Sequence, residues 1–68
     1  MWTEADEIAE TIMDGLSPEQ IAEFARSSNA ARHYLRSIMP DQGEVALSNT
    51  VESLHFFCKA HIMRPKQA

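Results

Sequence analysis

The chain has 68 residues, a formal net charge of −4 and a single cysteine, Cys58. A domain of this size buries only about 60% of the surface that its unfolded chain exposes, so its core is small. One cysteine excludes an internal disulfide as a compensating crosslink, and two glycines leave no glycine-rich loop for binding phosphate.

The net charge and the hydropathy also narrow the classes of partner that we expect for this chain. Phosphate contacts from Lys and Arg supply most of the affinity for nucleic acid. For this acidic chain we therefore expect a protein partner rather than nucleic acid. No stretch approaches the roughly 18 apolar residues of a membrane span, and the N-terminal stretch MWTEADEIAE is acidic, unlike a leader peptide. We expect a cytoplasmic protein that does not contact a membrane.

The first predicted helix covers residues 3–15. Thr3 is a suitable N-cap, acidic residues fill the opening turn, where they complement the helix dipole, and Gly15 ends the helix. Apolar residues recur at helical spacing and are expected to face the core: Ala5, Ile8, Ala9, Ile12, Met13 and Leu16.

The second predicted helix covers residues 18–27 and has the clearest start signal. In the stretch SPEQ, Ser17 is the N-cap, Pro18 takes the first helical position, and Gln20 closes a capping box. Its core side is expected to hold Ile21, Phe24 and Ala25.

Two further helices complete an all-α single domain. The third covers residues 30–39, capped by Ser28 or Asn29 and ended by Pro40. Its inward residues are expected to be Ala31, Tyr34, Leu35 and Ile38. The fourth and longest helix covers residues 45–63, and residues 65–68 are expected to form a disordered tail. The fold class is therefore a compact bundle of about four helices.

The last predicted helix has apolar residues on two sides. At about 100° per residue, one narrow stripe, expected to face the core, holds Leu47, Val51, Leu54, Cys58 and Ile62. The opposite side holds the candidate dimer interface: Val45, Phe56, Ala60 and Met63. A helix that is apolar on two sides is normally buried on both, so we expect an antiparallel homodimer through this helix. The alternative is a monomer in which Met1 or Trp2 folds back over Phe56.

The last predicted helix also contains a possible metal-ligand pattern. His55, Cys58 and His61 form a His-x-x-Cys-x-x-His pattern, and zinc accepts such donors. The two histidines, however, are six residues apart and diverge around a helix, while Cys58 falls in the core stripe, where a free cysteine is typically a small buried hydrophobe. We predict no metal, no cofactor and no catalytic residue.

A helix-turn-helix unit is the main alternative for function. The predicted second and third helices, joined by a Ser-Ser-Asn turn, resemble such a unit over about a third of the chain. The second of them would present Asn29, Arg32, His33 and Arg36 on its outer face, and these residue types suit phosphate and base-edge contacts. In the competing interpretation, Arg32 and Arg36 either form a solvated face or pair with the acidic first helix.

The acidic first helix favours a protein partner. Glu7, Glu10 and Asp14 form a stripe that could meet a basic surface, including the nucleic-acid-binding face of another protein. Inhibitors and antiactivators of this kind are common among very small helical proteins of bacteria and their phages. The sequence therefore predicts a non-catalytic regulator that acts by binding protein as an inhibitor, antiactivator or adaptor.

Overall fold

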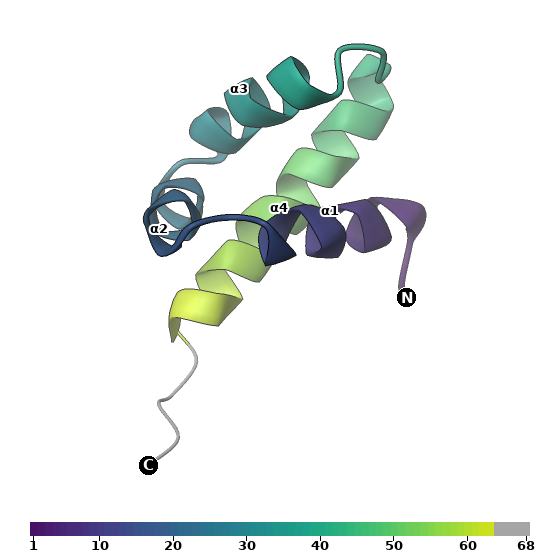
Figure 1. Ribbon diagram of the computed structural model, residues 1–68. Coiled ribbons are helices and arrows are strands. Elements are labelled where there is room, and N and C mark those ends of the chain that lie inside the picture. Colours follow the sequence, from purple (N-terminus) through teal and green to yellow (C-terminus); the bar gives the residue numbers. More distant parts are fainter. Residues whose placement is uncertain (64–68) are drawn as a thin grey trace.

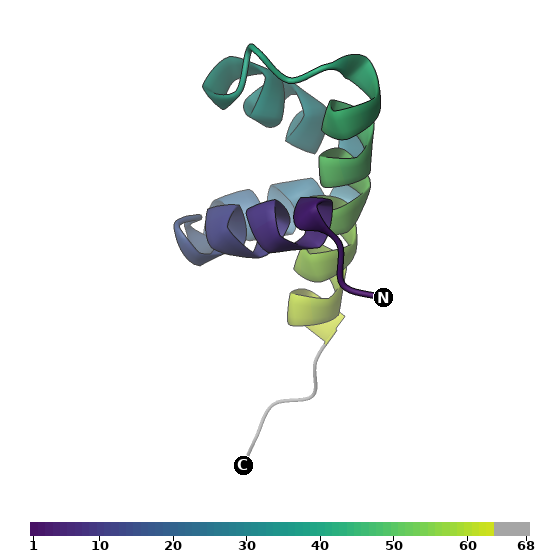
Figure 2. The ribbon, with the colours of Figure 1, turned by 90° about the vertical axis from the view of Figure 1, so that its right-hand side faces the viewer.

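The computed structural model describes residues 1–63, which form four helices. These are α1 (Glu4–Asp14), α2 (Pro18–Arg26), α3 (Ser28–Ile38) and α4 (Glu44–Met63). The shorter helices α1, α2 and α3 all pack against α4 (Figure 1), and they lie on the same side of it (Figure 2). The prediction of an all-α bundle with a longer C-terminal helix is confirmed. The tail predicted at residues 65–68 lies outside the described residues.

Capping boxes define the starts of the first two helices. The Thr3 hydroxyl accepts from the Asp6 N–H while the Asp6 carboxylate accepts from the Thr3 N–H, and Ser17 and Gln20 exchange the same pair of bonds. Each box satisfies two N–H groups that have no partner within the helix. Both helix starts therefore follow from local sequence.

The connection between α2 and α3 is a single residue, Ser27, and the expected Ser-Ser-Asn turn is wrong. The Ser27 N–H donates to the Glu23 carbonyl at the end of α2, while its hydroxyl accepts from the Ala30 N–H at 3.2 Å. Ser27 thus serves as both the C-cap and the N-cap, and Ser28 and Asn29 belong to α3 rather than capping it.

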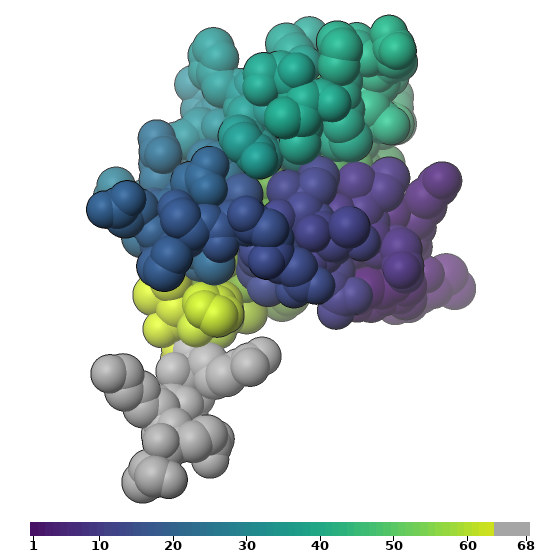
Figure 3. Space-filling model, in the orientation of Figure 1, coloured from purple at the N-terminus to yellow at the C-terminus, as the bar shows by residue number. Residues whose placement is uncertain are grey.

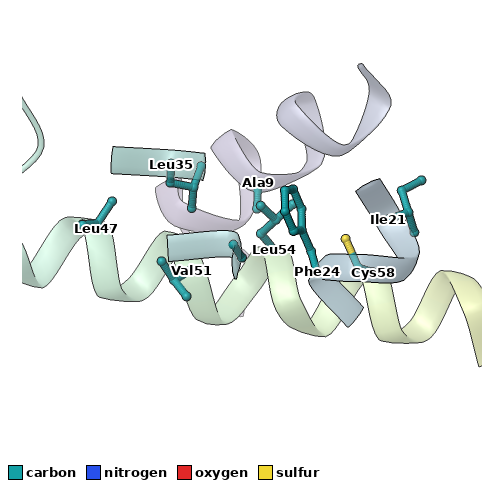
Figure 4. Close-up of a cluster of buried hydrophobic side chains, with 9 residues drawn as sticks. Ala9, Ile21, Phe24, Leu35, Leu47, Val51, Leu54 and Cys58 are labelled. Carbon is teal, nitrogen blue, oxygen red and sulfur yellow. The ribbon is translucent and has the colours of Figure 1, made fainter. Parts of the chain in front are cut away.

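The buried core lies where the three short helices meet α4. Leu47, Val51, Leu54 and Cys58 of α4 point toward Ala9, Ile21, Phe24 and Leu35 of the other helices (Figure 4). Ala9 of α1 is fully buried. Four of the five residues of the predicted core stripe on α4 are confirmed as buried.

Two residues expected in the core are exposed. Ile62, the fifth member of the α4 stripe, is 50% exposed, and Ile38 of α3 is 46% exposed. α1 and α2 cross the middle of α4 (Figure 1), and the yellow end of α4 emerges beyond them (Figure 3). Ile62 has the correct helical phase but lies past the covering helices, and Ile38 is the last residue of α3.

Within residues 1–63, no helix combines the length and apolar character that crossing a membrane requires.

Candidate interaction surface

The outer face of α4 carries exposed apolar residues. Val45 is 77% exposed, Phe56 65% and Met63 75%, and Ala60 is exposed as well. At about 100° per residue these four positions fall within about 60° of arc, on the side of α4 opposite to Leu54 and Cys58. The described part of the chain therefore leaves uncovered the same face that the sequence assigned to an interface.

An aromatic row borders this face. Trp2 stacks on Phe57 with ring centroids 5.8 Å apart and an interplanar angle of 18°, and Phe57 lies 6.0 Å from Phe56. The alternative in which Trp2 or Met1 covers Phe56 is wrong, since Trp2 contacts Phe57 instead and Met1 is fully exposed. The row extends the apolar surface from α4 toward α1.

A small pocket of about 170 Å³ lies beside the aromatic row. Its walls come from the N-terminal segment, α1 and α4, and consist of Trp2, Glu10, Met13, Phe57, Ala60 and His61. Sequence patterns gave no sign of it, because it depends on where α1 crosses α4.

The predicted acidic stripe is exposed on α1. Glu7, Glu10 and Asp14 lie within about 60° of arc and are all accessible to solvent. The indole N–H of Trp2 donates to Oε1 of Glu7 at 2.9 Å, and Glu10 lines the small pocket. The acidic stripe is therefore contiguous with the aromatic row.

The predicted basic face of α3 is divided. Asn29 and His33 are exposed, whereas Nη2 of Arg32 donates to the Ser48 hydroxyl at 3.2 Å and Nη2 of Arg36 donates to Oε1 of Glu44 at 3.2 Å.

These arginines pair with the start of α4, so their expected pairing with the first helix is wrong. Nη1 of Arg32 also lies 4.0 Å from Oε2 of Glu44. A helix-turn-helix unit joins its helices by a turn of three to four residues, whereas α2 and α3 share only Ser27.

The His-x-x-Cys-x-x-His residues point in three directions. Cys58 is fully buried, and this burial raises the pKa of its thiol. Nδ1 of His55 lies 2.7 Å from the Phe24 carbonyl oxygen, so this nitrogen carries the proton and caps the end of α2. His61 is exposed. Within residues 1–63 no three His, Cys, Asp or Glu side chains form a group that could hold a metal ion.

A larger polar groove of about 540 Å³ separates the start of α1 from the first half of α4. Two of its lining residues are joined by a hydrogen bond, in which the Ser53 hydroxyl donates to Oδ1 of Asp6 at 2.7 Å. Hydrogen bonds from the Thr3 N–H and the Ser53 hydroxyl hold the pKa of Asp6 below its ordinary value. Sequence reasoning placed Asp6 in the first turn but missed Ser53, because no local pattern links residues 47 positions apart.

No family model, curated protein or solved structure matches the chain. The surface itself then provides the functional argument. It presents an uncovered apolar face on α4, an aromatic row at its border, and an acidic stripe on α1 next to that row. Apolar centres with polar borders are typical of protein-binding surfaces.

Proposed function

We propose that this protein is a homodimeric, non-catalytic regulator that binds another protein as an inhibitor, antiactivator or adaptor in the cytoplasm. One observation supports the proposal. One face of α4 packs against the core of its own chain, and on the opposite face Val45, Phe56 and Met63 are exposed. Exposed apolar surface of this extent, rimmed by polar residues, marks interaction sites.

A second copy of the chain is the most economical cover for this face. A two-fold interface uses the same patch on both subunits, so each apolar residue contributes twice. Burying one such side chain contributes about 1.5–3 kcal/mol. In a chain whose total stability is roughly 3–10 kcal/mol, dimerisation through Phe56 and Met63 adds a term of similar size to the core.

The acidic stripe supports a basic protein surface as the target. Glu7, Glu10 and Asp14 are exposed and share one side of α1, next to the aromatic row that borders the outer face of α4. A patch of one sign steers association with a surface of the opposite sign. Because the stripe and the dimer face are on different helices, the dimer presents two acidic stripes to its target.

Sedimentation equilibrium tests the dimer. We expect the mass of two chains at roughly 50 μM, which requires a dimer Kd in the micromolar range or below, equivalent to about 8 kcal/mol of net binding free energy. A mass of one chain, 7.7 kDa, at this concentration would refute the proposal.

A gel-shift titration separates this function from the helix-turn-helix alternative. Under the proposal, duplex DNA is bound weakly without sequence preference, and Arg32→Ala with Arg36→Ala leaves its mobility unchanged. Sequence-selective retention that this double variant abolishes would favour a DNA-binding regulator.

A further inference from the structure

We propose that the two copies of α4 cross antiparallel, with Glu52 of each chain facing Lys59 of the other. This inference rests on the proposed homodimer and specifies its geometry. It follows from the placement of the only charged residues on the outer face of α4.

Glu52 and Lys59 flank the exposed Phe56 on the outer face. The face consists of residues 45, 49, 52, 56, 59, 60 and 63, and both charged side chains are exposed. Neither takes part in an ion pair among residues 1–63. Seven residues separate them, which is a rise of about 10.5 Å, so they do not pair within one helix as residues three or four apart do.

The centre of the charges lies close to the centre of the apolar surface. For the apolar residues, position 54 is halfway between Val45 and Met63, and Phe56 is the largest exposed side chain of the face. For the charged residues, the midpoint of Glu52 and Lys59 falls between positions 55 and 56. A two-fold axis perpendicular to α4 relates positions at equal distances from it, so a self-complementary face needs opposite charges placed symmetrically about its apolar centre. On the outer face the two charges are symmetric about a point between positions 55 and 56, within about two residues of the apolar centre.

Antiparallel packing brings Glu52 to within one helical turn of Lys59 of the second copy for every axis in this range. With the axis at position 54, position 52 lies opposite position 56 of the second copy, and with the axis at position 56 it lies opposite position 60. Lys59 of the second copy is within this span. The first register also brings Val45 onto Met63, and the second stacks the two Phe56 rings, an arrangement that aromatic pairs favour.

Parallel packing does not give this pairing. It would set Glu52 at the level of Glu52 and Lys59 at the level of Lys59, so that no opposite charge faces either residue and like charges share each level, which disfavours association. The face is therefore complementary to itself in the antiparallel orientation, because each Glu52 meets a Lys59. The occupant that fits the face is therefore a second copy of this chain in the antiparallel orientation.

Charge-reversal variants test the orientation by sedimentation at low salt. Glu52→Lys and Lys59→Glu should each raise the dimer Kd about tenfold, since two symmetry-related exposed pairs change from attraction to repulsion. The double variant keeps the net charge and should return the Kd to within about twofold of the wild-type value. Mixing the two single variants should give a heterodimer with wild-type affinity.

The controls are Glu19→Lys and Arg26→Glu, which make the same charge changes at exposed positions of α2 and should leave the Kd unchanged. If the wild-type chain dimerises but the single reversals behave like these controls, the antiparallel orientation is wrong and the proposed function stands. If the wild-type chain is a monomer, both fall. A double variant that stays weak while each single variant is weak also contradicts the pairing.

Discussion

Replacing Phe56 by Ala separates association from folding. Phe56 is 65% exposed, and complete burial of a Phe side chain contributes about 1.5–3 kcal/mol. The part that a second copy can still cover is then worth about 1–2 kcal/mol per chain, or about 2–4 kcal/mol for the two-fold dimer. At 1.4 kcal/mol per factor of ten, Phe56→Ala should raise the dimer Kd by about 30- to 700-fold.

Sedimentation velocity over a concentration series measures this change, and urea unfolding of the dilute chain measures folding. Only about a third of Phe56 is buried within its own chain, so the free energy of unfolding of the monomer should fall by no more than about 1 kcal/mol. Ile38→Ala is the matched control. Ile38 is 46% exposed but belongs to α3, so its removal should leave the Kd unchanged.

The proposed interface through the outer face of α4 is wrong if Phe56→Ala associates as tightly as the wild-type chain. The interface is also wrong if Phe56→Ala and Ile38→Ala weaken association equally, since that would indicate non-specific contacts between exposed apolar residues.

Three further predictions concern the fold. Leu54→Ala should lower the free energy of unfolding by about 2–5 kcal/mol in a urea titration, because Leu54 is fully buried and its loss leaves a cavity; a loss below 1 kcal/mol would contradict this packing. The pKa of Asp6 is lowered from 3.8, so its stabilising contribution is present above pH 4 and lost as the pH falls through the lowered value. Ser53→Ala and Asp6→Asn should therefore each reduce the loss of stability between pH 5 and pH 2, as followed by circular dichroism; an unchanged acid transition would argue against the bond between them. Cys58 is fully buried, and this burial raises the pKa of its thiol, so a thiol reagent at pH 8 should label it more slowly in the folded chain than in urea; equally fast labelling would show that the thiol is accessible.

Local signals in the sequence were enough to predict the helices. Thr3 with an acidic first turn, and Ser17 with Pro18, identify helix starts because the capping bonds join residues only three apart. The apolar period of the last helix likewise identified both its core stripe and its outer face. These features depend on bonds and spacings within one helix, so tertiary context did not alter them.

The helix connection at Ser27 shows where local signals stop being decisive. Ser27, Ser28 and Asn29 are all acceptable N-caps, and the sequence does not choose among them. In the structure Ser27 is the N-cap, and Ser28 and Asn29 are the first two residues of α3. This choice removes the turn on which the helix-turn-helix comparison depended.

The sequence by itself determined that the chain is helical and that its last helix is apolar on two sides. Only the tertiary structure decided which of these apolar residues are covered: Leu54 is fully buried in the core with residues of α1 and α2 (Figure 4), whereas Ile62, near the end of the same stripe, is 50% exposed. It also decided that Trp2 stacks on Phe57 and that Arg36 pairs with Glu44. Helical periodicity fixes the direction in which a side chain points, but burial and pairing depend on which distant segment reaches that position.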